Sequence, residues 1–302
     1  MLSEIFYWFL NMSITGTIIG FVVLTLSKVI KNQRRIYYIL WAIPFIRFWV
    51  PFAPVSKYGL MELITRLSER TVVLTDRSHT MAMTNHMAYA DSYFPIVYKT
   101  NLIAKIFEIG SVIWLIIAVS IILVLVISYI FAKREIRNAM HYKENIWFSD
   151  KLHSPAIYGI IRPKIVMPEN YKARDISFVL MHENVHIKCL DNLWRAIALI
   201  TAAAHWFNPF VWLFVRSFFN EMEFSCDEKV LARCDESEYK SYALSLIESA
   251  EVRSKLVAAY TGGKLSKRIE HILTWRKMSI FGAVCFIIFA SAIACVLITN
   301  PM

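Results

Sequence analysis

The residues with the clearest chemical potential are two histidines and a glutamate in the run His182-Glu183-Asn184-Val185-His186. The surrounding segment is compatible with a helix, and residues four apart lie on one helical face. Both imidazoles can therefore bind a single metal ion, and Glu183, about 100° further around the helix, can reach a metal-bound water. Two histidines, one further ligand and an open position form the usual catalytic zinc site, with the glutamate as general base. The motif thus predicts hydrolysis assisted by Zn2+.

The third zinc ligand is expected among the carboxylates of the next polar segment. Glu223 and Asp227 are four residues apart, so a helix would direct both side chains the same way. This spacing suits a pair in which Glu223 binds zinc and Asp227 hydrogen-bonds a ligand histidine. For Glu221 and Glu228 we expect a solvated helix face. His205 is a candidate for transition-state stabilisation, but its tryptophan-rich surroundings favour a structural role.

The chain as a whole is more apolar than soluble proteins of its length. Its 302 residues are 57% hydrophobic, with a mean hydropathy of +0.47. A membrane span needs about 20 apolar residues of helix, and four segments meet this requirement, at residues 5–26, 36–55, 106–131 and 278–299. No basic residue precedes the first segment and no small-residue cleavage site follows it, so we expect a span and not a signal peptide.

Basic residues predict the orientation of these spans, because Lys and Arg are enriched in cytoplasmic connections. They crowd the connection between the first two spans, follow the third and precede the fourth, whereas they are diluted in the loop 57–105. We therefore expect a multi-pass protein of the bacterial cell membrane, with its N-terminus and this loop outside. The net charge of +10 is explained mainly by these flanks and not by direct binding of nucleic acid.

A fifth apolar segment, at 193–215, requires a different explanation. A crossing there would place the basic run 264–277 outside the cell, against the charge pattern. Pro209 must also end or kink a helix. We therefore expect two helices, one on each side of Asn208-Pro209, that dip into the bilayer surface or pack in the domain core.

Residues 155–168 are predicted to form two short strands, because β-branched residues cluster there and Gly159, Pro163 and Pro168 punctuate them. Such a hairpin either has only a structural packing role, or its edge aligns an extended substrate through main-chain hydrogen bonds. Residues 133–142, before the hairpin, are predicted to continue the preceding helix.

These elements predict a predominantly α membrane protein with four transmembrane helices and a zincin-like α+β metalloprotease domain. The expected divisions are three spans with an extracellular loop in 1–131, a cytoplasmic zinc metallopeptidase domain in 132–277, and a fourth span with a short extracellular tail in 278–302.

Together these residues resemble the integral-membrane zinc metallopeptidases of the BlaR/MecR type, a gluzincin family of antibiotic-sensing antirepressors. The resemblance covers essentially the whole chain and implies that His182, His186 and Glu223 bind zinc, that Glu183 is the base, and that substrates are cytoplasmic. Family sensors carry a penicillin-binding domain after the last span, and for this chain we expect the protease half without that sensor domain. The shared motifs are the hairpin from Ser154-Pro155 to Pro168 with Gly159, Arg162-Pro163 and Val166-Met167-Pro168, then His182-Glu183-x-x-His186, His205-Trp206-Phe207-Asn208-Pro209 and Glu223-Phe-Ser-Cys-Asp227.

The leading functional hypothesis is an endopeptidase in signal transduction and antibiotic-resistance regulation that cleaves a cytoplasmic repressor, itself, or both. The alternatives are a membrane quality-control or CAAX-type zinc protease and a catalytically silent membrane receptor or scaffold, although the intact Glu183 argues against silence. Expected partners are the repressor, the lipid bilayer, and either a separate extracellular sensor or a second copy of the chain. For self-cleavage we expect an exposed loop at 256–266.

Overall fold

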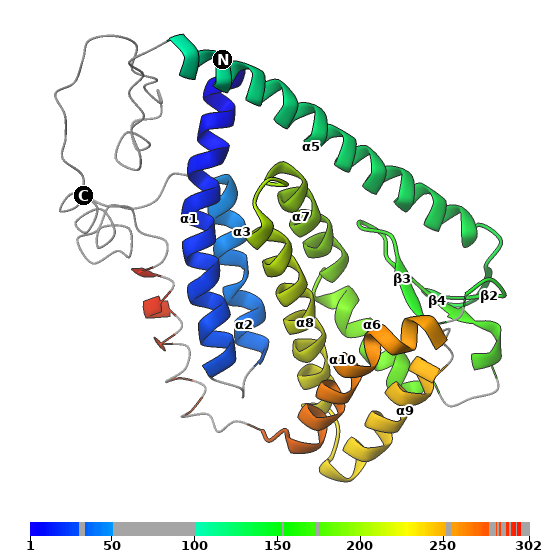
Figure 1. Ribbon diagram of the computed structural model, residues 1–302. Coiled ribbons are helices and arrows are strands. Elements are labelled where there is room, and N and C mark those ends of the chain that lie inside the picture. The colour runs from blue at the N-terminus through cyan, green and yellow to red at the C-terminus, as the bar shows by residue number, and fades with distance from the viewer. Residues whose placement is uncertain are drawn as a thin grey trace.

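The chain forms a helical bundle with one small sheet (Figure 1). The computed structural model describes residues 1–29, 34–50, 101–152, 154–172, 176–251 and 255–277, with short pieces between 282 and 296. The helices are α1 (Leu2–Val29), α2 (Arg34–Leu40), α3 (Ala42–Trp49), α5 (Asn101–Glu135), α6 (Ser177–Lys188), α7 (Asp191–Ala204), α8 (Pro209–Leu231), α9 (Tyr239–Glu251) and α10 (Lys255–Thr274). The strands are β1 (Met140–Lys143), β2 (Ile146–Ser149), β3 (Ala156–Tyr158) and β4 (Lys164–Pro168). The predominantly α class with a short hairpin is confirmed.

Two of the described helices are long and apolar enough to cross a membrane. They are Leu2–Lys28 within α1 and Lys105–Arg134 within α5, which correspond to the first and third predicted spans. Most of the loop at 57–105 and most of the fourth span at 278–299 lie outside the described residues. The four-crossing arrangement and its orientation therefore stay a prediction.

The second predicted span is divided into α2 and α3, which meet at Trp41. Pro44 lies four residues after Leu40, so it cannot donate a helical hydrogen bond to the Leu40 carbonyl, and its ring crowds that carbonyl. The two pieces have 7 and 8 residues, each well below the roughly 20 residues of a straight span.

The fifth apolar segment forms the predicted pair of helices, α7 and α8, and this prediction is confirmed. The Asn208 side chain accepts a hydrogen bond from the Phe210 N–H at 3.0 Å, and Pro209 occupies the first helical position, where no N–H partner is lost. Asn208 Nδ2 also donates to Ser13 Oγ at 2.8 Å and Thr17 Oγ1 at 2.7 Å. The tip of the helix pair is therefore docked on the long apolar helix α1.

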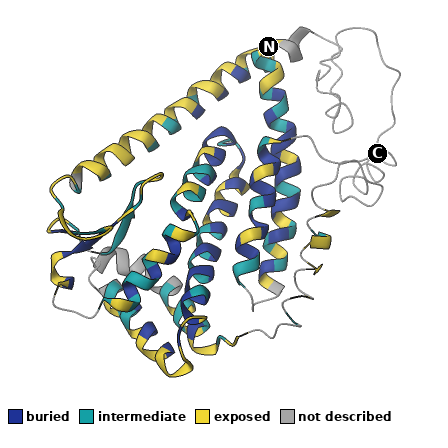
Figure 2. Ribbon diagram, turned by 180° about the vertical axis from the view of Figure 1, so that it is seen from behind, coloured by how far each residue is buried: buried dark blue, intermediate teal, exposed yellow. Residues whose placement is uncertain are grey.

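The largest hydrophobic core is shared between the N-terminal helices and a segment more than 140 residues further along the chain. Its members come from α1, α2, α3, α7 and α8, which appear as the mainly dark-blue helices in Figure 2, whereas α5 is mostly exposed. Gly20 of α1 permits the close approach of α8, since a Cβ there would lie 2.3 Å from the Phe214 ring. The part of the chain assigned to the protease domain thus completes the core of the N-terminal helices.

The small sheet has the strand order β1-β2-β4-β3. The predicted hairpin is the antiparallel pair β3–β4, in which Ile157 lies opposite Ile165, and Gly159 takes the positive φ of 102° that its turn requires. Strands β1 and β2 were not predicted, and β2 runs parallel to β4. The helix expected over 133–142 ends at Glu135, because β1 begins five residues later. All four residues of β1 are exposed, so the strand is held by its pairing with β2 and not by burial of one face.

The loop predicted at 256–266 is wrong, because these residues lie within α10. Each glycine of Gly262-Gly263 weakens a helix by about 1 kcal/mol relative to alanine. Good helix formers on both sides of the pair, and packing of α10 against α8 and α9, outweigh that cost.

Candidate metal centre

Two histidines of α6 and one glutamate of α8 direct three ligand atoms toward one point. His182 Nε2 and His186 Nε2 are 3.1 Å apart, and Glu223 Oε2 lies 3.6 Å from the first and 3.8 Å from the second. A tetrahedral zinc with bonds of about 2.0–2.1 Å keeps its nitrogen and oxygen ligands about 3.3–3.4 Å apart. The triangle of atoms therefore has nearly the size that one such ion requires.

Hydrogen bonds at the Nδ1 atoms of the two histidines indicate which ring nitrogens carry a proton and which offer a lone pair to a metal. His186 Nδ1 lies 2.5 Å from Asp191 Oδ2, a carboxylate oxygen that can only accept, so Nδ1 carries the proton. Tyr242 donates its single hydroxyl proton to Asp227 Oδ1 at 2.6 Å and must accept from His182 Nδ1 at 2.8 Å. In neutral imidazoles both Nε2 lone pairs then face one another, an arrangement that a bound cation stabilises.

A tight turn after α6 returns Asp191 to His186. Leu190 adopts the left-handed conformation, with φ 56° and ψ 36°, which costs a non-glycine residue roughly 1–2 kcal/mol. Asp191 then begins α7, and its second carboxylate oxygen accepts a hydrogen bond from the Tyr38 hydroxyl of α2 at 2.5 Å. One carboxylate thus links the metal-site histidine to the bent N-terminal helix pair.

Asp227, the predicted partner of a ligand histidine, supports His182 through an intermediate residue. Its Oδ1 lies 3.5 Å from His182 Nδ1, and the Tyr242 hydroxyl bridges the two groups. Arg268 of α10 binds both carboxylate oxygens, with Nε to Oδ2 at 2.8 Å and Nη2 to Oδ1 at 2.7 Å. Helices α9 and α10 therefore contribute to the centre as well as α6 and α8.

Glu223 lies between two arginines. Arg195 Nη2 donates to Oε1 at 2.8 Å, and Arg268 Nη1 lies 3.1 Å from Oε2. Burial alone would raise the pKa of Glu223, but His186 and Arg268 outweigh burial and hold the pKa well below its usual value. Burial likewise would lower the pKa of His186, but the Glu223 charge and the Asp191 hydrogen bond raise it. The Glu223 carboxylate is therefore ionised at neutral pH and suited to bind a cation.

Glu183 is a further carboxylate of the centre, and its charge acts on His186 and Cys226. It is partly exposed on α6, and it forms no hydrogen bond or ion pair with any other residue in the described part of the chain. It lies about 100° around the helix from His182. A carboxylate beside the ligand atoms suits a group that accepts and releases a proton.

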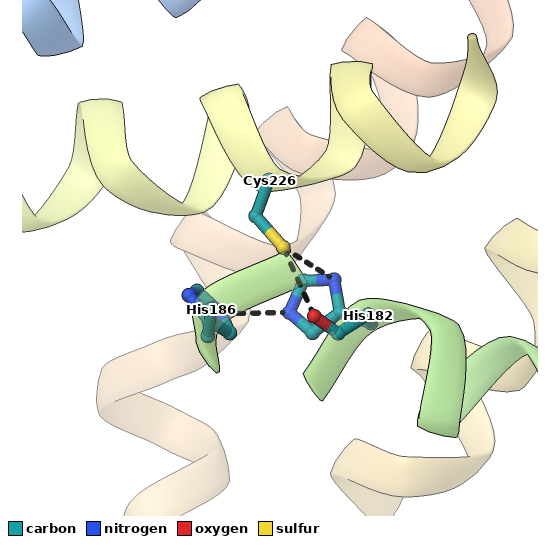
Figure 3. A group of neighbouring side chains, drawn as sticks. All are labelled: His182, His186 and Cys226. Carbon is teal, nitrogen blue, oxygen red and sulfur yellow. Dashed lines mark hydrogen bonds between the residues drawn. The ribbon is translucent and has the colours of Figure 1, made fainter. Parts of the chain in front are cut away.

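Cys226 is a further candidate ligand (Figure 3). Its sulfur and one nitrogen of each histidine lie within 4.8 Å of one another. The sulfur contacts His182 at Nδ1 and at the carbonyl oxygen, both at 3.3 Å, and so lies away from Nε2. Burial, followed by the charges of Asp227 and Glu223, raises the pKa of the thiol well above its usual value, which opposes the thiolate form that binds metals. Glu223 is the better-placed third ligand.

His205 is not brought to this centre. It follows α7 at the end opposite Asp191, and the 14 residues of that helix rise about 20 Å. His205 is fully buried, with the rings of Phe9, Phe48 and Trp49 around it. These surroundings favour the structural role over transition-state stabilisation.

The expectation of a solvated face at Glu221 and Glu228 is wrong, because their exposed fractions are 6% and 1%. Arg34 Nη1 donates to Glu221 Oε1 at 2.7 Å. The Arg34 backbone N–H donates to Glu228 Oε1 at 2.8 Å, and His271 Nε2 lies 3.0 Å from the same oxygen. The N-terminal end of α2 and a histidine of α10 therefore supply partners for the acidic face of α8.

Four supporting residues of the centre, Asp191, Arg195, Tyr242 and Arg268, were missed from the sequence. Asp191 had a usable signal, since it is a carboxylate five residues after the second histidine of the motif. Tyr242 and Arg268 had none, because they lie 60 and 86 residues beyond His182 in the chain.

A helix with two histidines one turn apart, a carboxylate ligand from a second helix and a further glutamate beside them is the arrangement of H-E-x-x-H metallopeptidases. The chain belongs to the BlaR1 peptidase M56 family, whose sequence model matches residues 7–272. The resemblance inferred from the motifs is confirmed.

Three relatives illustrate the similarity. The chain is 30% identical over 143 residues to regulatory protein BlaR1 of Bacillus licheniformis, a match covering 46% of this chain and 24% of that protein. It is 24% identical over 150 residues to the methicillin resistance mecR1 protein of Staphylococcus aureus (45% and 26% covered). It is 23% identical over 273 residues to regulatory protein BlaR1 of Staphylococcus aureus (80% and 45% covered). The chain thus spans less than half the length of these relatives.

Proposed function

We propose that this chain is a zinc endopeptidase of the bacterial cell membrane that acts in signal transduction by hydrolysing a cytoplasmic transcriptional repressor, itself, or both. The observation that carries the proposal is the convergence of His182 Nε2, His186 Nε2 and Glu223 Oε2 within 3.1–3.8 Å, with Glu183 beside them. Membership of a peptidase family supports the reaction. The names of the relatives, a regulatory protein and a methicillin resistance protein, support the signalling role.

The donor set of two imidazoles and one carboxylate fits zinc. A zinc ion held by these residues would polarise the scissile carbonyl and lower the pKa of a bound water. Glu183 accepts the proton of the attacking water and delivers it to the leaving amine. Asp191 and Tyr242 keep the Nδ1 protons of the histidines engaged, so that both Nε2 atoms stay directed inward.

Strand β3 lies at the edge of the sheet, and we propose that an extended substrate binds along it. Asn192 Nδ2 donates to two outward carbonyls of this edge, Ile157 O at 3.2 Å and Gly159 O at 3.0 Å. A small pocket beside His186 is lined by residues of the hairpin, of α6 and of the turn into α7, among them Ile157 and Ile160. A backbone carbonyl has two lone pairs, so a substrate N–H can still bind while Asn192 holds the strand.

The charge pattern supports a cytoplasmic location for this centre, with the N-terminus outside. The two apolar helices of spanning length agree with attachment to a bilayer. The stimulus then reaches the centre through the spans, either from a separate extracellular sensor or through a second copy of the chain. Direct contact with nucleic acid is not part of the proposal.

The experiment compares the wild-type chain with Glu183→Ala in reconstituted membranes, with a repressor encoded next to the gene as substrate. We expect one zinc per chain in both proteins and cleavage slowed by about 10²–10⁴-fold or more in the variant, because the general base is lost. Wild-type cleavage by Glu183→Ala would contradict the mechanism. Cleavage of unfolded membrane proteins but not of the repressor would favour the quality-control alternative.

A further inference from the structure

Arg268 is the residue of α10 that joins two metal-site helices. Its guanidinium binds both oxygens of Asp227, lies 3.1 Å from Glu223 Oε2 through Nη1, and lies 3.5 Å from His182 Nε2 through Nη2. The contacts are largely shielded from solvent, since the side chain of Arg268 is 18% exposed and that of Asp227 is fully buried. A charge at this position therefore acts on the ligand atoms with little screening.

The shape of the guanidinium suits this position. Arginine presents five N–H donors in a rigid plane, so it can bind one carboxylate with two donors and still direct a third elsewhere. Here Nε and Nη2 bind Asp227, while Nη1 is directed at Glu223. A lysine ammonium at the same place is a single point charge that can satisfy one carboxylate well but not both in this geometry.

We propose that Arg268 is a positioning residue of the metal centre, which orients Glu223 directly and His182 through Asp227 and Tyr242. This inference rests on the proposed function, because it presumes that these ligands bind a metal. Without Arg268, the buried Asp227 carboxylate loses its cation, and the Tyr242 hydroxyl that orients His182 loses a fixed acceptor.

A second effect of Arg268 has the opposite sign. Its contact with Glu223 Oε2 competes with a metal for that oxygen, so loss of the contact alone would strengthen metal binding. The supporting effect is the larger one, since Asp227 is fully buried and loses two hydrogen bonds, whereas the Glu223 side chain is 29% exposed and loses one contact. Arg195 also continues to hold the other oxygen of Glu223. Removing Arg268 therefore weakens metal binding.

The test measures Zn2+ and Co2+ affinity by chelator competition on the metal-stripped full chain in nanodiscs. The variants are Arg268→Gln and Arg268→Lys, and the matched control is Lys267→Gln, which removes the same charge from an exposed neighbour on α10. We expect Arg268→Gln to bind about 10–100-fold more weakly, as for other residues that support a metal ligand. Arg268→Lys should recover part of the loss, and Lys267→Gln should match the wild type. The visible absorption spectrum of bound Co2+ should change in Arg268→Gln and not in the control.

Thermal unfolding of each metal-free variant separates misfolding from loss of ligand orientation. If Arg268→Gln does not fold, Arg268→Lys provides the same comparison with a smaller expected loss. An unchanged or higher affinity in the folded variant overturns this inference while leaving the proposed function intact. A wild-type chain that binds no metal overturns the proposed function itself.

Discussion

The carboxylate of Glu228 accepts a hydrogen bond from the backbone N–H of Arg34, 194 residues earlier in the chain, at 2.8 Å. The same helix, α8, carries Glu223 and Asp227, which are turned about 140° and about 100° around the helix from Glu228 at about 100° per residue. One rigid element thus meets the candidate metal centre on one side and the N-terminal end of α2 on the other.

Replacing Glu228 by Gln is expected to destabilise the fold by about 1.5–3 kcal/mol, because the buried carboxylate that accepts hydrogen bonds from the backbone N–H groups of Arg34 and Arg35 loses its charge. Denaturant unfolding in detergent would measure the loss. Glu236→Gln, the same change at an exposed position, is the control and should stay within about 0.5 kcal/mol of wild type. Equal stability of the two variants would show that the Glu228 contacts contribute nothing net.

Metal content distinguishes Glu223 from Cys226 as the third ligand. Glu223→Ala should abolish stable zinc binding, since two imidazoles alone leave the site short of a ligand. Cys226→Ala should retain one zinc, because the sulfur lies on the Nδ1 side of His182. Elemental analysis of the purified proteins measures the zinc content of both variants. Zinc retained in Glu223→Ala and lost in Cys226→Ala would make Cys226 the third ligand instead of Glu223.

Asn192→Asp tests the assignment of β3 as the substrate strand. The variant keeps the size of the side chain but turns a carboxylate toward the carbonyls of Ile157 and Gly159. We expect KM for peptide cleavage to rise by about tenfold, the equivalent of one or two hydrogen bonds, with zinc content unchanged. Asn170→Asp, on an exposed turn, is the control. A fall in kcat with unchanged KM would instead indicate that Asn192 acts on the chemical step.

Glu221 should make stability depend on pH. Burial raises its pKa from 4.5 to about 7 even though Arg34 opposes the shift. A carboxyl group whose pKa is higher in the folded state binds its proton more tightly when folded. Its stabilising contribution is therefore complete below about pH 4.5 and is lost as the pH rises through 7.

Glu221→Gln removes this dependence, so the stability of the variant relative to wild type should increase between pH 5 and pH 8, by an amount on the order of 2–3 kcal/mol. Thermal unfolding across that range measures the difference, with Glu236→Gln as the control. Parallel curves for Glu221→Gln and wild type would contradict the buried, proton-binding state of Glu221.

The sequence allowed the proximity of the candidate metal ligands to be predicted, because their side chains follow local spacing rules. His182 and His186 are separated by one helical turn, and so are Glu223 and Asp227. Burial of Glu221 was not predictable, because its partner Arg34 is 187 residues away. A helix face rich in acids has the same sequence pattern whether solvent or a distant basic segment covers it.

The secondary structure was predictable where a strong local signal existed, as at Asn208-Pro209, where a capping side chain and a proline agree. It was not predictable at β1, whose four residues are all exposed. Nor was it predictable at Gly262-Gly263, where two glycines favour a loop but tertiary packing retains a helix.

The shared carboxylate of Asp191 has a mechanical consequence. Tyr38 and His186 are joined through it by two hydrogen bonds of 2.5 Å each, so α2 cannot slide relative to α6 without lengthening one bond or rotating the imidazole. A sub-ångström displacement of α2 would therefore alter the aim of a candidate ligand nitrogen. The strength of metal binding would then report strain in the N-terminal helices, with no ligand gained or lost.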